Sequence, residues 1–129
     1  MTCKMIQCTD IFRSTSTEEE FTIHCTATCK TNNIIYLLEC PICSFQYIGE
    51  TKRQLCERLR NHKSDVYRKP GRSLSKHIKS ADHKINFDEL KVTIIDHNSD
   101  WDNKNRLDRE RFWITKLKTQ SPNGINVLM

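Results

Sequence analysis

Apolar residues follow strand-like patterns in three parts of the chain. Compact apolar runs, rich in β-branched and aromatic residues, occupy 33–39 and 91–96, and an alternating run that ends on glycine occupies 45–49. These patterns predict three strands. Because only the short, proline-containing segment 41–44 separates the first strand from the one at 45–49, we expect those two to pair as a hairpin.

Helical spacing appears in three other segments. Residues 51–67 place two leucines and a valine on one face, and residues 73–82 suit a short second helix. Residues 99–120 predict a long helix with acidic residues near its start and lysines near its end, as the helix dipole favours.

Together these elements predict an α/β (α+β) domain over 34–129. Its core would be a small, mainly antiparallel three-stranded sheet flanked by helices. The segment 1–33 is polar, rich in Thr and Ser, and carries four cysteines. We expect this Cys-rich N-terminal segment to be irregular, mostly loop, with a short strand near 21–25.

Composition adds limits on core size and compartment. The chain has 129 residues, 36% hydrophobic and 29% charged, which predicts one domain with a lean core that a bound metal would help to stabilise. No signal peptide is apparent, and the run "IIYLL" is too short to span a bilayer. We therefore expect an intracellular protein without a membrane span, whose seven cysteines serve as metal ligands or free thiols.

Positive charge is concentrated in one stretch. The net charge is +5, and residues 50–80 hold ten Lys or Arg against three acidic residues. Such a block favours a polyanionic partner, nucleic acid first, although a solvated basic helix face would have the same composition.

Glu110 does not fit an ordinary amphipathic helix. Leu107, Ile114 and Leu117 define the expected buried stripe of the last helix, and Glu110 lies within it. A carboxylate that faces a core costs several kcal/mol, to an order of magnitude, unless it binds a cation or an arginine. Metal ligation and an ion pair with an arginine such as Arg58 both remain open.

Four further side chains could join Glu110 at one end of the sheet. Arg58 and His62 are i, i+4 neighbours on the first predicted helix, while Tyr36 and Tyr47 lie on the two hairpin strands. The bland alternatives are a basic helix face and two core aromatics. As a group, two phenols, an arginine, an imidazole and a carboxylate suit hydrolysis of a phosphodiester.

The order of these motifs resembles a known family. "IIY", ten residues and then "YIG" resemble the signature of the GIY-YIG endonucleases. Arg58 with His62 is similar to the family's arginine-x-x-x-histidine helix, Glu110 in "RERFWI" to its metal-binding glutamate, and Asn126 in "GIN" to its C-terminal asparagine. The resemblance covers about residues 34–126, and the four motifs lie in register.

The details look closest to the GIY-YIG domains of Penelope-like retroelements. That branch carries two cysteines between the halves of the signature, here Cys40 and Cys43, and two downstream histidines, here His77 and His83. This spacing suits a tetrahedral Zn²⁺ site, with a pair of buried free thiols as the alternative. In one departure from the family pattern, Ile34 stands at the first glycine of the name.

The resemblance implies an endonuclease that nicks DNA. Glu110 would hold Mg²⁺ (or Mn²⁺), Arg58 would stabilise the transition state, and Asn126 would support the site. The proton acceptor stays open among the two tyrosines and His62. The expected catalytic residues are Tyr36, Tyr47, Arg58, His62, Glu110 and Asn126. The expected DNA-binding residues are Lys52, Arg53, Arg60 and Lys63.

The remaining expectations concern the N-terminal cysteines, a partner domain, the location in the cell and two rival functions. Cys3, Cys8, Cys25 and Cys29 have spacing that could bind a second Zn²⁺, with unordered thiols as the rival. A retroelement nuclease would act beside a reverse transcriptase domain of a longer parent protein, and a DNA substrate would imply nuclear residence. Two rival functions are an inert zinc-stabilised nucleic-acid-binding module and a zinc-dependent protein-interaction domain.

Overall fold

A computed structural model describes residues 11–23, 27–28, 30–80 and 85–127. His83 and the four N-terminal cysteines, Cys3, Cys8, Cys25 and Cys29, lie outside these ranges. The expectations about a fourth zinc ligand and a second zinc site are therefore not addressed by the structure. No described helix is both long and apolar enough to cross a bilayer.

The central sheet has three antiparallel strands. They are β3 (Ile34–Glu39), β4 (Gln46–Thr51) and β5 (Lys91–His97), in the order β4-β3-β5. The predicted hairpin of β3 and β4 and the predicted third strand are confirmed. β3 is buried along nearly its whole length because it is the middle strand and is covered on both faces.

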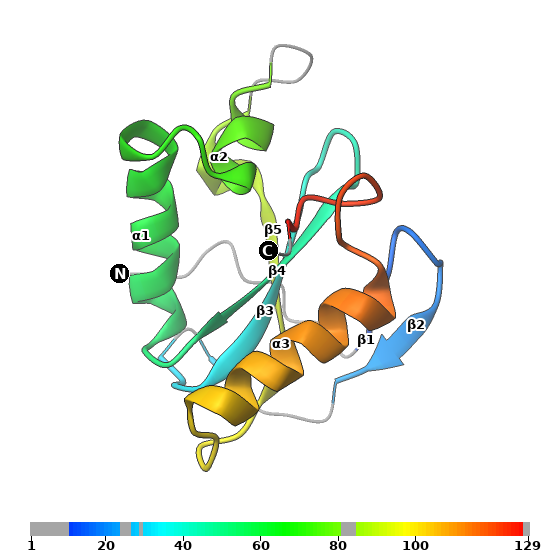
Figure 1. Cartoon of the computed structure of the whole chain (residues 1–129), viewed down its shortest axis with the longest axis vertical. Helices are drawn as coiled ribbons and strands as arrows, with labels where there is room; N and C mark the ends of the chain where they lie inside the picture. Colours follow the sequence, from blue (N-terminus) through cyan, green and yellow to red (C-terminus); the bar gives the residue numbers. More distant parts are fainter. Residues whose placement is uncertain (1–10, 24–26, 29, 81–84, 128–129) are drawn as a thin grey trace.

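Helices cover both faces of this sheet (Figure 1). Helix α1 (Leu55–Arg68) and α2 (Ser73–Ile78) lie on one side with the short 3₁₀ turn η1 (Phe87–Glu89), and α3 (Asn103–Leu117) lies on the other. Each α-helix is shorter than the segment predicted for it. For α3 the reason is local: the Asp102 side chain accepts a 2.8 Å hydrogen bond from the Asn105 N–H and so caps the helix start.

The N-terminal segment contains a two-stranded hairpin where the sequence predicted one short strand near 21–25, which overlaps β2 (Glu20–Thr22). Strands β1 (Ile11–Arg13) and β2 form an antiparallel hairpin. Phe12 of this hairpin is 5% exposed and packs into the α3 side of the core. The hairpin was hard to predict because each strand has three residues and carries few apolar side chains.

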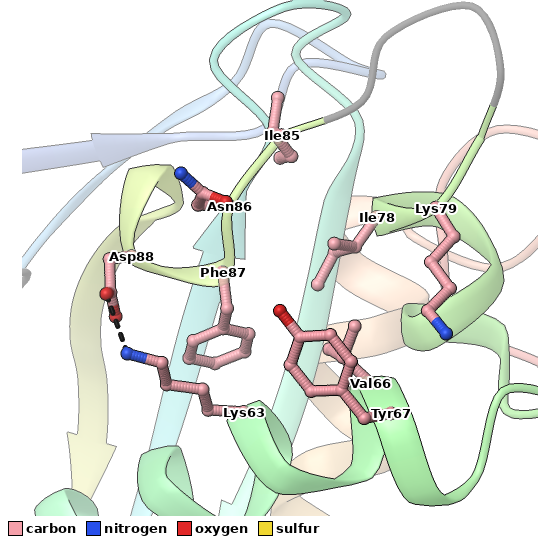
Figure 2. Close-up of a pocket in the computed structure, with 9 residues that line it drawn as sticks. All are labelled: Lys63, Val66, Tyr67, Ile78, Lys79, Ile85, Asn86, Phe87 and Asp88. Carbon is pink, nitrogen blue, oxygen red and sulfur yellow. Dashed lines mark hydrogen bonds and ion pairs between the residues drawn. The ribbon is translucent and has the colours of Figure 1, made fainter.

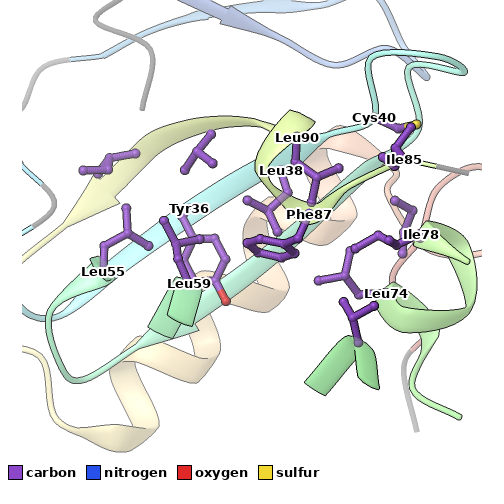
Figure 3. Packing of buried hydrophobic residues seen from close by; sticks show 14 of the residues in the cluster. Tyr36, Leu38, Cys40, Leu55, Leu59, Leu74, Ile78, Ile85, Phe87 and Leu90 are labelled. Atoms are coloured by element: carbon purple, nitrogen blue, oxygen red, sulfur yellow. The ribbon is translucent and has the colours of Figure 1, made fainter. Parts of the chain in front are cut away.

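The hydrophobic core consists of two clusters, one on each face of the sheet. Alternate residues of β3 point to opposite faces, so neighbouring side chains enter different clusters. The α1 cluster, seen in Figure 3, includes Ile34, Tyr36, Leu38, Leu55, Leu59, Leu74, Phe87 and Leu90. The α3 cluster comprises Phe12, Ile35, Leu37, Ile48, Ile95, Ile114 and Leu117.

One predicted core residue is wrong. Leu107 is 44% exposed, whereas Ile114 and Leu117 are buried as expected. At the start of α3 the neighbouring Arg106 is buried instead, at 6% exposure. Its guanidinium forms hydrogen bonds and an ion pair with polar side chains at that position. The buried face of α3 is therefore polar at one end and apolar at the other.

Candidate active site

Tyr36 reaches the edge of the sheet by lying across a glycine. It belongs to the middle strand β3, and Gly49 is its direct partner on the edge strand β4. A Cβ at Gly49 would lie 2.3 Å from both the Cζ and the hydroxyl oxygen of Tyr36. The "YIG" glycine is therefore required by this close approach, and the tyrosine ring occupies the space that a side chain would fill.

The Tyr36 hydroxyl meets His62 and Arg58 from helix α1. Its oxygen lies 2.5 Å from the His62 Nε2 atom, and the Arg58 guanidinium is also in hydrogen-bonding contact with it. Burial is the main cause that raises the pKa of Tyr36 well above its usual value, with Tyr47 adding to the effect. At neutral pH this phenol therefore keeps its proton.

His62 is enclosed by aromatic rings. Its ring centroid lies 5.8 Å from that of Tyr47 and 6.2 Å from that of Phe87. Burial, followed by the positive charges of Arg58 and Arg72, lowers the pKa of His62 to about 3. The imidazole is thus neutral at physiological pH, which is the form able to accept a proton.

A cleft of about 640 Å³ opens beside this group. Tyr47, Arg58 and His62 line it, together with Arg72 and Lys76 of the α2 segment. Tyr36, by contrast, is fully buried behind it. The hydroxyl of Tyr47 has no hydrogen-bond partner among the described residues, and burial raises its pKa. Of the two tyrosines, Tyr47 is the one that a ligand in the cleft can touch.

Glu110 lies near this group without a partner of its own. Its half-buried carboxylate forms no hydrogen bond and no ion pair with any residue that the structure describes. Burial, and then the nearby charge of Glu50, raises the pKa of Glu110 to about 7, while Arg58 acts in the opposite direction. The ion pair between Glu110 and Arg58, considered from sequence, is absent within the described chain. A cation beside Glu110 would compensate the buried charge.

Asn126 supports strand β4 through its side-chain amide. Its Oδ1 accepts a 2.7 Å hydrogen bond from the Ile48 N–H, and its Nδ2 donates a 2.8 Å bond to the Ile48 carbonyl. The Thr119 hydroxyl donates a further 2.7 Å bond to Oδ1. Because Ile48 lies between Tyr47 and Gly49, Asn126 fixes the part of β4 that carries the signature.

Comparison with known families agrees with this geometry. The family model of the GIY-YIG catalytic domain matches residues 32–126, most of the chain. The chain belongs to the GIY-YIG family. No curated protein and no solved structure gives a significant match. Membership indicates a nuclease of the hydrolase class in general, with DNA as the implied substrate.

The GIY-YIG domain also contains a buried polar connection that sequence reasoning missed. Arg106 of α3 forms an ion pair with Glu50 of β4, and it donates hydrogen bonds of 3.1 Å to Asn33 and 2.9 Å to Asn103. Arg106 lies one turn before Glu110, and Glu50 follows Gly49 directly. The connection therefore fixes how the carboxylate helix sits against the signature strand. An arginine followed four residues later by a glutamate was the only sequence signal.

Arg72 was missed as well. It is the residue before α2, and it shares the cleft with Arg58 and acts on the pKa of His62. From sequence it was one of ten basic residues in the block, and nothing in its local pattern set it apart.

The four predicted DNA-binding residues do not form one surface. Lys52 and Arg53 line a second cleft of about 250 Å³ that also contains Arg58, Glu50 and Arg106. Arg60 is exposed on α1 outside both clefts. Lys63 pairs with Asp88 at 2.8 Å and borders a different pocket of the GIY-YIG domain. The structure thus brings Lys52 and Arg53 into the same cleft as Arg58 and leaves the other two apart.

The cysteine pair of the GIY-YIG domain meets a histidine at the far end of the hairpin. Cys40 and Cys43 flank the tight turn between β3 and β4, where the Ser44 N–H bonds to the Cys40 carbonyl at 2.9 Å. The ligand atoms of Cys40, Cys43 and His77 all lie within 4.8 Å of one another. Two thiolates and an imidazole suit a soft ion such as Zn²⁺. These three residues could therefore hold a metal that joins the hairpin turn to α2.

Proposed function

We propose that this GIY-YIG domain is a divalent-metal-dependent endonuclease that nicks DNA by hydrolysing one phosphodiester bond. The observation that carries the proposal is the convergence of Tyr36, Tyr47, Arg58 and His62 beside one cleft, with the unpartnered carboxylate of Glu110 nearby. A mere nucleic-acid-binding module would need the basic residues but would gain nothing from a buried neutral histidine held against a tyrosine.

Arg58 and Arg72 would bind the scissile phosphate. Both side chains line the cleft, and a guanidinium can donate two parallel hydrogen bonds to phosphate oxygens. As water attacks, negative charge grows on the non-bridging oxygens. A donor already in place, such as Arg58 held against Tyr36, stabilises that charge without needing to reorganise.

The same arginines make His62 sensitive to the substrate. Burial and the charges of Arg58 and Arg72 hold the pKa of His62 near 3, so the free enzyme has a weak base. A phosphate bound between the arginines would offset their charge and raise the proton affinity of the imidazole. In this scheme the water oxygen bonds to phosphorus as the bond to the leaving oxygen breaks. The proton of the water passes to the Nδ1 atom of His62, because Nε2 faces the Tyr36 hydroxyl, and the leaving oxygen takes up a proton from solvent.

Tyr47 would orient the attacking water, and Tyr36 would orient His62. Tyr47 borders the cleft with a hydroxyl free to bond water, whereas the Tyr36 hydroxyl is already engaged by His62 and Arg58. Both phenols keep their protons at neutral pH because their pKa values are raised. We therefore assign the proton acceptance to His62 and the positioning of the water to Tyr47.

Glu110 would hold the divalent ion, Mg²⁺ or Mn²⁺. The residues fit such an ion because the carboxylate is half-buried, has no partner among the residues that the structure describes, and has its pKa raised by burial and by Glu50. When bound, the ion would polarise the phosphate as a Lewis acid.

The decisive experiment is nicking of supercoiled plasmid by the zinc-loaded chain in Mg²⁺. The wild type is compared with Glu110→Gln, which removes the charge and keeps the shape of the side chain. We expect nicking by the wild type and at least a 100-fold slower rate for the variant. Equal nicking by both would assign the activity to a contaminant. If neither nicks although both are folded, the endonuclease proposal fails.

We further infer that Cys40, Cys43 and His77 bind a structural Zn²⁺ with His83 as the fourth ligand, and that the domain derives from a Penelope-like retroelement. The proximity of the three described ligands supports the zinc site, and the position of the cysteines between the signature halves supports the origin. A reverse transcriptase domain as partner and nuclear residence are parts of the same proposal. Native mass spectrometry should find one Zn²⁺ fewer in Cys43→Ser than in the wild type; zinc bound equally by both would contradict the site.

A further inference from the structure

A pocket separate from the cleft beside His62 lies between helix α1, α2 and η1 (Figure 2). Its volume is about 560 Å³, within the range of small-molecule binding sites. Three elements contribute to it: the last turns of α1, the end of α2 and the segment that leads into η1. The residues that line it are Lys63, Val66, Tyr67, Ile78, Lys79, Ile85, Asn86, Phe87 and Asp88.

The aromatic ring of Tyr67 forms an exposed wall of this pocket. This residue is 73% exposed, the most exposed of the large hydrophobic residues that the structure describes. The Lys79 ammonium lies 5.4 Å from the centroid of its ring. A flat aromatic ring held at the surface beside a cation is the arrangement on which nucleobases stack in proteins that bind single strands.

Two lysines at the rim are placed to contact phosphate. Lys63 is held by its 2.8 Å ion pair with Asp88, and its side chain remains 53% exposed. Lys79 extends from the opposite side of the pocket, from the residue that follows α2 (Figure 2). Asp88 is the one acidic side chain among the lining residues, and it is already paired. The charge at this pocket therefore favours a polyanion.

The floor of the pocket is apolar and adjoins the catalytic group. Val66, Ile78, Ile85 and Phe87 are buried and present carbon surface to the cavity. The Phe87 ring also stacks on His62, with planes 26° apart. A ligand in this pocket would thus be separated from the catalytic histidine by one aromatic ring.

We propose that this pocket is an accessory nucleobase subsite. One base of an unpaired DNA strand stacks on Tyr67, and Lys63 and Lys79 contact the phosphates on either side of it. The proposal rests on DNA being the substrate of the proposed function, and it names a structural preference: DNA with unpaired bases binds better than a fully paired duplex.

The test separates contacts to bases from contacts to the backbone. Binding of a fluorescent 15-nucleotide thymidine oligomer is measured by anisotropy with the zinc-loaded chain, without Mg²⁺, alongside an oligomer of equal length whose central residues are abasic. Base stacking on an aromatic side chain is typically worth about 5- to 100-fold in affinity. We expect Tyr67→Ala to weaken binding of the thymidine oligomer by at least about fivefold and to leave binding of the abasic oligomer unchanged.

Two variants serve as controls. Tyr67→Phe keeps the ring and should retain wild-type affinity. Phe112→Ala removes an exposed ring of similar size from α3, on the opposite face of the sheet, and should have no effect. An equal loss for both oligomers, or no loss, in Tyr67→Ala would overturn the subsite.

Failure of the subsite and failure of the nuclease can be told apart because the binding assay needs no catalysis. If the plasmid is nicked but Tyr67→Ala has no effect on binding, the subsite proposal fails and the endonuclease proposal stands. If binding depends on the bases and on Tyr67 but the plasmid is not nicked, the subsite proposal stands and the endonuclease proposal fails. Stronger binding of a blunt duplex than of the thymidine oligomer would contradict the proposed preference for unpaired bases.

Discussion

The two faces of the sheet use polar residues differently. On the α1 face, Tyr36 belongs to the hydrophobic cluster and His62 is buried against the Phe87 ring of that cluster, and the pKa values of both are strongly shifted. On the α3 face, the cluster itself is apolar and aromatic, and charged side chains such as Arg106 and Arg109 pair with carboxylates at its rim.

The difference places the destabilising titratable groups on the α1 face of the sheet. Buried titratable groups with shifted pKa values are destabilising unless each is matched, and such mismatches gather at functional sites. The α3 face resembles an ordinary core with satisfied ion pairs. Glu110 of α3 differs, because its half-buried carboxylate has no hydrogen bond or ion pair among the described residues and its pKa is raised by burial.

The largest effect is expected for Gly49→Ala, which attacks the α1 face directly. The new Cβ would lie 2.3 Å from the Tyr36 ring, so the ring and its bond to His62 must move. Misplacement of a catalytic group by about 1 Å can cost about 100-fold in rate, and we expect at least that loss of plasmid nicking. Gly71→Ala is the matched control, because a Cβ there meets no atom within 4 Å. Similar activities for the two variants would contradict the role given to Gly49.

Ile114→Ala tests the α3 face as a purely structural core. Ile114 is 1% exposed, and truncation of such a residue typically costs about 3 kcal/mol of unfolding free energy. Nicking per folded molecule should be unchanged. Leu107→Ala provides the comparison, with a change within about 0.5 kcal/mol because that side chain is already 44% exposed. Urea denaturation measures the change in unfolding free energy for both variants. A large loss for Leu107→Ala would show that Leu107 belongs to the buried stripe expected from sequence.

Arg106→Met probes the ion pair that joins α3 to β4. Breaking this largely buried pair leaves the charge of Glu50 uncompensated beside Glu110. We expect a loss of about 2 kcal/mol of unfolding free energy, which is less than for a fully buried pair because Glu50 is partly exposed. The double variant Glu50→Gln with Arg106→Met should recover most of that loss in urea denaturation. If the double variant is no more stable than the single one, Arg106 acts through packing and not through the pair.

Glu110→Gln should change stability with the opposite sign, making the fold more stable. The pKa of Glu110 is about 7 in the folded chain against 4.5 as the reference, so the folded state binds more protons between these values. Charging Glu110 therefore destabilises the fold as pH rises through this window, and the penalty is complete above pH 7. Without Mg²⁺, the Gln variant should be about 1–2 kcal/mol more stable at pH 8, allowing for partial solvent screening.

Denaturation at a series of pH values checks the sign of this effect. The advantage of the Gln variant should shrink as pH falls from 8 toward 5, and the buffers must contain no chelator, which would remove zinc. A variant less stable than the wild type at pH 8 would show that Glu110 has a stabilising partner when charged.

Much of the fold could be predicted from sequence because its elements have strong local signals. The run at 33–39 is too apolar and β-branched for anything but a buried strand, and the short turn after it allows only an antiparallel neighbour. The face of α3 was harder. Periodicity places Leu107 on the apolar stripe, but it cannot say that Arg106 has three polar partners that bury it.

The candidate site could be predicted from the sequence only in part, for a similar reason. Tyr36, Tyr47, Arg58, His62 and Glu110 could be named because residue type and order carry information. The contacts that arrange them join residues far apart in the chain: Tyr36 with Gly49, Arg106 with Glu50, and Asn126 with Ile48. A single sequence does not encode such pairs in any local pattern.

The amide of Asn126 has a consequence for solubility. β4 is an edge strand, and the outward N–H and carbonyl of an edge strand can pair with a strand of another molecule and start aggregation. Asn126 occupies both groups of Ile48, and the Ile125 N–H occupies the Gln46 carbonyl at 2.9 Å. The C-terminal loop thus covers backbone groups of Gln46 and Ile48 and shortens the open edge of the strand on which the signature tyrosine and glycine lie.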